Sequence, residues 1–265
     1  MIQTNQTCLR HPSCREAIAH LGTCCHWDAN DDQLAMVFGA RLSLPAAELP
    51  PFQFTKHPMD ERVKMLDGAV PLELAMKCRA LAHSVSASSI KPMDNIDNKP
   101  TRNIFNNYDR YIAPSDTPKW MWREYYEGTS RLFPRDLATL RSSPLAELIF
   151  YIDERFRAMF GQTIEPELWA VQFMAKDSYN GWHFDEMGTR KIAFLYYLTP
   201  NNWDYEKDGG GLVVQRKDSE ELFTIQPAFN RLVMWTMVNH AVEKVRRGKG
   251  RVALVGFYRR RGDYP

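Results

Sequence analysis

Two short stretches of the chain carry a histidine and an aspartate separated by one residue, a spacing that can serve a metal ion. They are residues 26–28 and residues 183–185, and each has a further histidine at the same distance downstream, His83 and His240 respectively. Imidazole nitrogens and a carboxylate oxygen suit a divalent transition metal. The spacing alone does not distinguish the two stretches.

The sequence between the histidines does distinguish them. Residues 29–82 are interrupted by prolines and then have a helical pattern, whereas residues 186–239 are a succession of short strand patterns with a glycine turn at 209–211. Only the second segment is expected to place its two ends on adjacent strands of one sheet.

His183, Asp185 and His240 are therefore the candidate metal ligands. On a strand, residues i and i+2 project from the same face, so the first two can approach one ion, and the third can join them from a neighbouring strand. This set is the facial triad of non-haem Fe(II) oxygenases, which leaves coordination positions open for a co-substrate and dioxygen. Any one of the three taken singly is also explained as a solvated or internally hydrogen-bonded side chain.

Arg251 is the second chemical signal. It opens a strand pattern in which alternation places it on the same face as Ala253, Val255 and Phe257. An arginine inside an apolar barrel is costly unless a carboxylate meets it in a bidentate pair. No obvious acidic partner stands in the sequence, so a dicarboxylate co-substrate is expected. An exposed position at the strand start, or Lys249 in this role, is the alternative.

A helix and then several strands must position these residues. Ser143 as N-cap, Pro144 in the first turn, apolar residues at helical spacing and Gly161 at the end predict a helix. The period then changes to two, and the β-branched and aromatic runs are 167–176, 191–199, 211–215, 221–227, 230–237 and 251–259. This order predicts an α+β fold in which helices flank an antiparallel sandwich or barrel.

The first 165 residues are less regular. Residues 59–87 carry apolar side chains among helix-forming neighbours, which predicts one or two amphipathic helices interrupted at residues 68–71. Residues 91–120 are polar, aperiodic and contain aromatic residues, which favours a functional lid. We expect one domain over residues 1–265, mostly helix and loop up to residue 165, with a catalytic β core over residues 166–260.

Charge and composition argue against several classes of protein. With 34 Lys and Arg against 32 Asp and Glu, the net charge of +2 gives no electrostatic reason to expect nucleic acid or a membrane as partner. The absence of a long apolar run and of a signal-like N-terminus favours a cytoplasmic location. The Cys and His residues between Cys8 and His26 lack paired CxxC spacing, so reduced thiols are expected there rather than zinc or disulfides.

From about Leu168 to Tyr258 the chain resembles the prolyl-4-hydroxylase-like branch of the Fe(II)/2-oxoglutarate oxygenases, which includes the hypoxia-type prolyl hydroxylases. The segments that carry this resemblance are "HFD" at 183–185, "YYLT" at 196–199 leading to "NNWDYEKDGGGL", "IQPAFNRLVMW", "HAV" at 240–242 and "RVA" at 251–253. The resemblance implies a double-stranded β-helix (jelly roll) with His183, Asp185 and His240 as iron ligands.

The resemblance also implies the residues that bind the co-substrate. Arg251 is expected to pair with the distal carboxylate of 2-oxoglutarate, and Tyr197 to hydrogen-bond the same carboxylate. Where the hypoxia-type enzymes carry a co-substrate-facing tyrosine, this chain has Phe173, which puts that contact in doubt. The implied cofactor is Fe(II), with 2-oxoglutarate and O2 as co-substrates.

The implied activity is a dioxygenase reaction that hydroxylates an unactivated C–H bond while 2-oxoglutarate is decarboxylated to succinate and CO2; desaturation or cyclisation remains open. We expect a small, amino-acid-like or natural-product substrate. A peptidyl-prolyl hydroxylase acting on a protein is the alternative, and a non-catalytic jelly-roll module that binds metal or ligand is the alternative from another class.

Four further residues are candidates for the substrate pocket. Arg190 is a candidate to bind a substrate carboxylate, or else forms a surface salt bridge. Tyr179, Trp182 and Trp235 are candidates to line the pocket, although aromatic residues beside strands often belong to the core.

Overall fold

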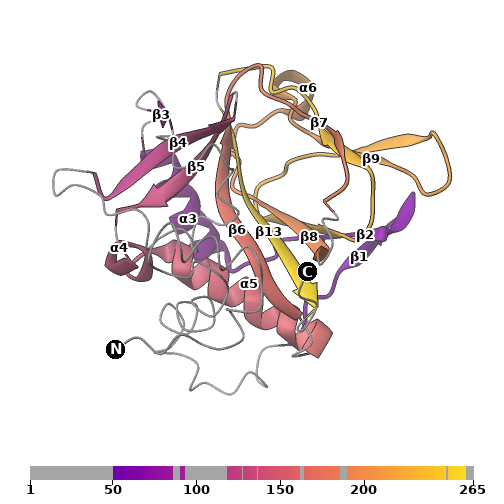
Figure 1. Ribbon diagram of the computed structural model, residues 1–265, viewed down its shortest axis with the longest axis horizontal. Helices are drawn as coiled ribbons and strands as arrows, with labels where there is room; N and C mark the ends of the chain where they lie inside the picture. The colour runs from indigo at the N-terminus through magenta and orange to yellow at the C-terminus, as the bar shows by residue number, and fades with distance from the viewer. Residues whose placement is uncertain are drawn as a thin grey trace, which may run out of the picture.

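The computed structural model describes most of the chain from residue 50 onward. The described ranges are 50–85, 90–92, 118–126, 128–135, 137–161, 164–185, 190–248 and 250–260. Within them the strands form two sheets, and the helices between residues 72 and 160 pack on the outer side of the larger sheet (Figure 1). This is the α+β fold class that the sequence predicts.

The larger sheet has nine strands and the smaller sheet has four. In spatial order the nine strands are β1 (Thr55–His57), β2 (Asp60–Asp67), β11 (Arg231–Trp235), β8 (Arg190–Tyr197), β13 (Arg251–Arg260), β6 (Ile164–Met174), β5 (Thr129–Pro134), β4 (Trp120–Tyr126) and β3 (Lys91–Pro92). The four are β10 (Leu222–Ile225), β9 (Leu212–Gln215), β12 (His240–Val242) and β7 (Asn180–His183). The runs with a period of two correspond to β6, β8, β9, β10, β11 and β13, so those predictions are confirmed.

Side-chain alternation along the central strands separates two apolar clusters. On β8, Ala193, Leu195 and Tyr197 belong to an inner cluster between the two sheets, while Phe194 and Tyr196 belong to an outer cluster beneath the helices. Because both faces of such a strand are buried, its sequence is an almost unbroken apolar run. The inner cluster contains residues of both sheets, as expected for a double-stranded β-helix.

Within the described ranges four helices accompany the sheets: α3 (Leu72–Ser84), α4 (Leu137–Arg141), α5 (Pro144–Phe160) and α6 (Tyr205–Asp208). The predicted helix is α5, with Ser143 in the N-cap position and Gly161, at φ 71°, ending it. Among the described residues no helix has the length and apolar character needed to cross a bilayer.

The packing of α5 fixes the outer face of the larger sheet. The ring of Phe156 is fully buried and lies 5.4 Å from the ring of Phe194 and 5.0 Å from that of Tyr258. Asp153 is buried beside them, where it accepts hydrogen bonds from the Tyr258 hydroxyl at 2.9 Å and from Arg157 at 2.7 Å. Because the buried carboxylate is hydrogen-bonded on both oxygens, it stabilises the contact between helix and sheet.

The prediction of helix for residues 59–87 is wrong in its first half. The segment Asp60–Asp67 is the strand β2, and only the part after residue 71 forms the helix α3. β2 pairs with β11, which lies far away in the sequence, and buries Val63 in the inner cluster. This long-range pairing overrides the local helix-forming tendency.

The region before residue 165 therefore contributes five strands, β1 to β5, as well as helices. The predicted lid over residues 91–120 falls mainly on residues outside the described ranges, which include only its two ends. The N-terminal Cys and His cluster also lies outside them. The lid and the reduced thiols remain predictions from the sequence.

Substituting Phe156→Ala should lower the free energy of unfolding by about 3–5 kcal/mol, because it removes a fully buried ring between α5 and the larger sheet. The measurement is urea unfolding followed by circular dichroism. Leu222→Ala, at an exposed position on β10, is the control and should change this free energy by about 0.5 kcal/mol or less. Equal effects of the two variants would contradict the assigned packing of α5.

Candidate active site

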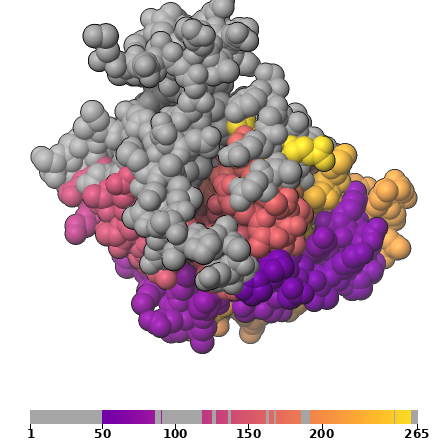
Figure 2. All heavy atoms as spheres, turned by 90° about the horizontal axis from the view of Figure 1, so that it is seen from below, coloured from indigo at the N-terminus to yellow at the C-terminus, as the bar shows by residue number. Residues whose placement is uncertain are grey.

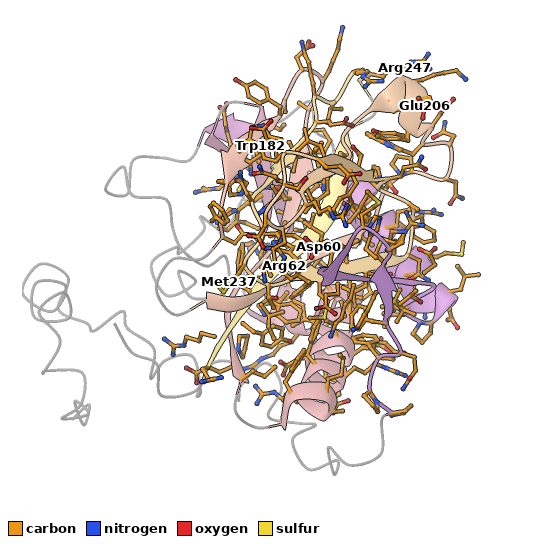
Figure 3. The ribbon with its side chains drawn as sticks, turned by 90° about the vertical axis from the view of Figure 1, so that its right-hand side faces the viewer. Asp60, Arg62, Trp182, Glu206, Met237 and Arg247 are labelled. Carbon is orange, nitrogen blue, oxygen red and sulfur yellow. The ribbon has the colours of Figure 1, made fainter. Side chains whose placement is uncertain are left out.

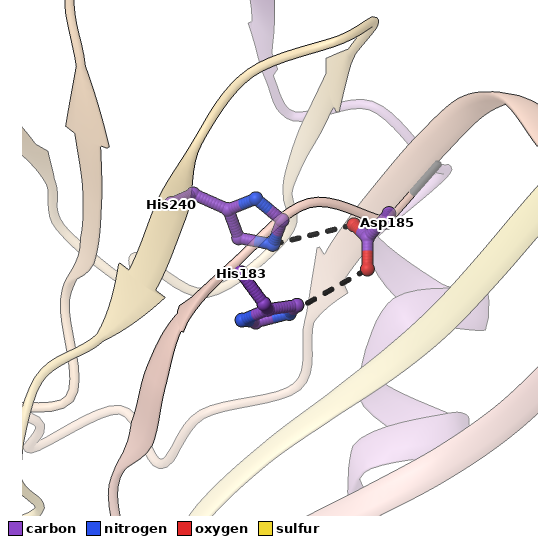
Figure 4. A group of neighbouring side chains, drawn as sticks. All are labelled: His183, Asp185 and His240. Carbon is purple, nitrogen blue, oxygen red and sulfur yellow. Dashed lines mark ion pairs between the residues drawn. The ribbon is translucent and has the colours of Figure 1, made fainter. Parts of the chain in front are cut away.

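The two histidines of the predicted site lie opposite each other on paired strands. β7 ends at His183, β12 begins at His240, and the two residues are partners in the antiparallel register. Asp185 lies just beyond β7, and its carboxylate is directed toward both imidazoles (Figure 4). His183 Nε2 is 3.6 Å from Asp185 Oδ1, and His240 Nε2 is 3.2 Å from Asp185 Oδ2. The chain thus brings together the three residues that the sequence singled out.

This group has the dimensions of a metal site. One ligand atom from each residue lies within 4.8 Å of the other two. Ligand atoms bound at about 2.1 Å and at right angles are about 3 Å apart, so small side-chain adjustments would accommodate one ion. Two imidazoles and one carboxylate are the donor set of the non-haem Fe(II) triad, and they fit this metal.

Both imidazoles are oriented by a backbone carbonyl two residues earlier in the chain. His183 Nδ1 is 2.6 Å from the carbonyl oxygen of Gly181, and His240 Nδ1 is 3.1 Å from that of Val238. We assign the proton to Nδ1 in each ring, which donates it to the carbonyl and leaves a lone pair on Nε2 that can bind a metal. In His183 this atom lies 3.4 Å from Asn180 Nδ2. Contacts of this kind commonly hold metal-binding histidines in place.

The charges in the group favour an ionised carboxylate. Burial by itself would raise the pKa of Asp185, but the contacts with His183 and His240 outweigh burial and hold this pKa well below its usual range. Burial would likewise lower the pKa of His183, and its contacts with Asp185 and the Gly181 carbonyl raise it instead. Asp185 is therefore an anion, ready to bind a cation between the two rings.

Arg251 begins β13 and is buried completely between the sheets. Among the described residues it forms no ion pair; Nη1 contacts Met174 Sδ at 3.4 Å, while Nε and Nη2 have no hydrogen-bond partner. The guanidinium carbon lies 5.1 Å from the ring centroid of Tyr197, whose buried hydroxyl also has no partner. Buried groups of this kind are costly unless an acceptor meets them.

Tyr197 remains a hydrogen-bond donor in this environment. Burial raises the pKa of its phenol, and the neighbouring Arg251 offsets this only in part. The two side chains therefore present O–H and N–H groups and a positive charge on the same inner face. An anion with several acceptor oxygens, such as the carboxylate of 2-oxoglutarate, fits this arrangement.

Two glycines allow the backbone to approach this region closely. Gly210 has φ 74°, and a Cβ atom there would lie 2.9 Å from Cδ of Arg251. Gly250 has φ 71°, and a Cβ atom there would lie 2.0 Å from the ring of Phe173. The "GGG" turn can therefore pass close to the Arg251 side chain, and the turn before β13 close to the ring of Phe173, because both glycines lack a side chain.

Phe173, whose contact with the co-substrate the sequence put in doubt, does not face the inner cluster. Phe173 belongs to the outer cluster, where its ring lies 5.4 Å from that of Trp122. The next residue, Met174, faces the inner cluster and is the register partner of Arg251. Alternation along β6 requires that Phe173 and Met174 face opposite sides of the sheet. Only the pairing of β6 with β13 shows which of them meets Arg251.

The four candidate substrate residues have different environments. Trp235 is 4% exposed in the inner cluster, its ring centroid is 5.0 Å from that of His240, and its indole N–H has no partner. Tyr179 and Trp182 are 65% and 49% exposed, so they do not line an enclosed surface. Arg190 begins β8, but its side chain lies outside the described residues, so its role remains a prediction.

Of the first His-x-Asp stretch and its downstream histidine, the structure describes only His83. His83 lies in α3, and its Nε2 is 3.0 Å from the carbonyl oxygen of Leu198. Residues 26–28 lie outside the described ranges. The environment of His83 agrees with a structural role for this histidine.

Known proteins and protein families share similarity with this chain. Residues 169–259 match the family model described as the 2OG-Fe(II) oxygenase superfamily. No curated protein matches the chain. One similar solved structure is a prolyl hydroxylase from Trichoplax adhaerens in complex with a hypoxia inducible factor oxygen degradation domain peptide fragment, at 14% identity, covering 89% of this chain and 94% of that chain, with a TM-score of 0.50.

Two further solved structures are similar over most of the chain. A prolyl-4-hydroxylase from Pseudomonas putida is 18% identical and covers 76% of this chain and 93% of that chain, with a TM-score of 0.44. A 2OG-Fe(II) oxygenase family oxidoreductase from Burkholderia pseudomallei is 17% identical and covers 81% of this chain and 96% of that chain, with a TM-score of 0.48.

Residues 169–259, which form most of the β core, match the 2OG-Fe(II) oxygenase superfamily, and the chain has the double-stranded β-helix fold. It is an Fe(II)- and 2-oxoglutarate-dependent dioxygenase, which uses O2 as its second co-substrate. This assignment favours an enzyme over the non-catalytic jelly-roll module.

Replacing Arg251 with an apolar side chain should separate two effects: the cost of the buried charge to stability and the contribution of this charge to binding of 2-oxoglutarate. We expect Arg251→Met to raise the free energy of unfolding without 2-oxoglutarate by about 1–4 kcal/mol, because a buried charge without an ionic partner is removed. With Mn²⁺ present, 2-oxoglutarate at about 100 times its dissociation constant should stabilise the wild type by about 2.7 kcal/mol and the variant by much less. Urea unfolding with and without 2-oxoglutarate measures both effects.

Arg216→Met is the control for this experiment. Arg216 forms an exposed ion pair with Glu221, so its loss should change the free energy of unfolding by less than about 1 kcal/mol and leave the effect of 2-oxoglutarate intact. Undiminished stabilisation of Arg251→Met by 2-oxoglutarate would show that Arg251 does not bind the co-substrate.

Proposed function

We propose that His183, Asp185 and His240 hold Fe(II), that Arg251 and Tyr197 bind the distal carboxylate of 2-oxoglutarate, and that the enzyme hydroxylates a small molecule. The observation that carries the proposal is the buried guanidinium of Arg251, which has no acidic partner among the described residues and lies between the same two sheets as the inner cluster. A protein that bound only a metal would have no use for this unpaired cation.

The residues of the site have separate roles in this proposal. Iron, when bound, supplies the activation of O2 that is coupled to decarboxylation of 2-oxoglutarate and oxidation of a substrate C–H bond. His183 and His240 present Nε2 because their Nδ1 protons are held by backbone carbonyls. Asp185 supplies the negative charge, and the apolar inner cluster limits the access of water.

We propose a small, amino-acid-like or natural-product substrate. Trp235 supports a substrate that enters the interior, because its buried indole N–H lacks a partner next to the ring of His240. Such a donor suits a carbonyl or carboxylate oxygen close to the reacting carbon. Arg190 at the start of β8 is our candidate for binding a substrate carboxylate.

A peptidyl-prolyl substrate is the second candidate, and a specific observation favours it. Tyr179, Trp182 and Phe184 are 65%, 49% and 57% exposed, and they lie on or beside β7, the edge strand that carries His183. Exposed aromatic side chains at a site suit a substrate that extends beyond an enclosed pocket.

The first experiment tests the co-substrate assignment. Anaerobic addition of Fe(II) and 2-oxoglutarate to the wild type should give a weak metal-to-ligand charge-transfer band in the visible spectrum. His183→Ala should abolish the band, because a ligand is lost, and Arg251→Ala should weaken it at a fixed 2-oxoglutarate concentration. No band in the iron-loaded wild type would contradict the proposed site.

Succinate release then separates the two substrate classes. Small amino acids and their derivatives should stimulate decarboxylation of 2-oxoglutarate if the first proposal is correct. Stimulation by proline-containing peptides alone would instead establish the peptidyl-prolyl alternative.

The role of Trp235 is tested by a substitution that keeps an aromatic ring and removes the N–H. With the substrate that the screen identifies, Trp235→Phe should lower kcat/KM by about tenfold, since a hydrogen bond from a buried donor is lost. The charge-transfer band should persist. Trp169→Phe is a matched control, because Trp169 also has a buried N–H without a partner but belongs to the outer cluster. An equal loss in both variants would argue against a substrate contact.

A further inference from the structure

An ion pair at the start of β2 lies beside the turn that leads to His240. Asp60 and Arg62 form a bidentate contact, with Arg62 Nε 3.0 Å from Asp60 Oδ1 and Arg62 Nη2 2.5 Å from Asp60 Oδ2. The Asp60 side chain is 3% exposed and that of Arg62 is 23% exposed. This pair is therefore more enclosed than an ordinary surface salt bridge, and its geometry is fixed on both oxygens.

The third nitrogen of Arg62 reaches the turn between the two sheets. Arg62 Nη1 donates to the carbonyl oxygen of Met237 at 2.8 Å (Figure 3). Residues 236–239 connect β11 of the larger sheet to β12 of the smaller one, and Met237 has φ 50°, a conformation that a residue with a side chain seldom adopts. The guanidinium thus holds a strained turn at its centre.

This turn also orients the histidine that follows it. The carbonyl of Val238, the residue after Met237, accepts the hydrogen bond from His240 Nδ1 at 3.1 Å. A displacement of Met237 would move this carbonyl and therefore rotate the imidazole. Arg62 bonds to the carbonyl of Met237, and the carbonyl of the next residue, Val238, orients the ring of His240.

The same carboxylate holds a second loop of the smaller sheet. Asp60 Oδ2 accepts a hydrogen bond from the backbone N–H of Lys217, in the turn between β9 and β10, at 3.1 Å. Gln215 at the end of β9 bonds to Asn239 through its side chain at 2.9 Å and through its backbone N–H at 3.0 Å. In Figure 2 the indigo and purple N-terminal strands lie next to the orange segment on one face of the molecule.

We infer that Asp60 and Arg62 form a positioning pair for His240. The pair fixes the turn between the sheets from one side, while Gln215 fixes it from the other, so that His240 Nε2 stays 3.2 Å from Asp185 Oδ2. This inference rests on the proposed function of His240 as a metal ligand. It assigns to the N-terminal strand a role in the metal centre, although that strand contributes no ligand.

The test compares this pair with a second ion pair, which joins the far end of β2 to β11. Arg231 on β11 pairs with Asp67 on β2 at 2.6 Å and also donates to a backbone carbonyl, that of Gln226, at 3.0 Å. Arg231→Met therefore removes the same kinds of contact as Arg62→Met, but not at the turn before His240. Both variants should be less stable to urea than the wild type.

The measurement is the affinity for Mn²⁺, determined by titration calorimetry with purified metal-free protein. If Arg62 only stabilised the fold, its substitution would not change this affinity. Arg62→Met should raise the dissociation constant by about tenfold, the loss typical when contacts that orient a metal ligand are removed. Arg231→Met should leave it within about twofold of the wild type. Arg62→Lys keeps the charge beside Asp60 but loses the planar guanidinium, so its dissociation constant for Mn²⁺ should lie between those of the wild type and Arg62→Met. This second variant keeps the test decisive if Arg62→Met does not fold.

The outcomes separate this inference from the proposed function. Unchanged Mn²⁺ affinity in both Arg62 variants, or an equal loss in Arg231→Met, would overturn the positioning role while leaving the metal site intact. A wild type that does not bind Mn²⁺, or binds it equally well after His183→Ala, would overturn the proposed metal site and with it the role of Arg62. Weaker binding in the Arg62 variants alone would establish the pair as a positioning element.

Discussion

The antiparallel pairing of β7 with β12 is the constraint on which the site depends. It sets His183 opposite His240, and the chain continues from β7 to Asp185 within two residues. β12 also pairs with β9, so the position of His240 is fixed from both of its edges. The site is therefore built on the backbone hydrogen bonds of a sheet, which hold side chains more accurately than a loop alone would.

The interior between the sheets combines apolar packing with hydrogen-bond donors that lack acceptors. Arg251, Tyr197 and Trp235 each bury an N–H or O–H group without a partner among the described residues. Each such group reduces the stability of the protein without its ligand. The arrangement is understandable in an oxygenase of this superfamily, because a co-substrate and a substrate rich in oxygen acceptors would meet these donors.

The outer layers keep this interior in place. On the helix side, Asp153 of α5 bonds to Tyr258 of β13, the strand that begins with Arg251. On the opposite edge, β2 extends the larger sheet and brings Asp60 and Arg62 to the turn before His240. One contact reaches the strand that carries Arg251 and the other reaches the turn before His240, so described segments of the first 165 residues pack directly against the β core.

The sequence by itself determined the strands of the core, the helix α5 and the residue types of the site. Alternation placed Tyr197 and Arg251 on inward faces, and the succession of strand patterns distinguished His183 from His26. These features depend on local periodicity, which is visible in one segment at a time. Only the tertiary structure decided that Asp60–Asp67 is a strand, that Met174 rather than Phe173 meets Arg251, and that Arg62 reaches Met237. Each of these depends on pairing between segments far apart in the chain, and the register of such pairing is set by the packing of the whole molecule.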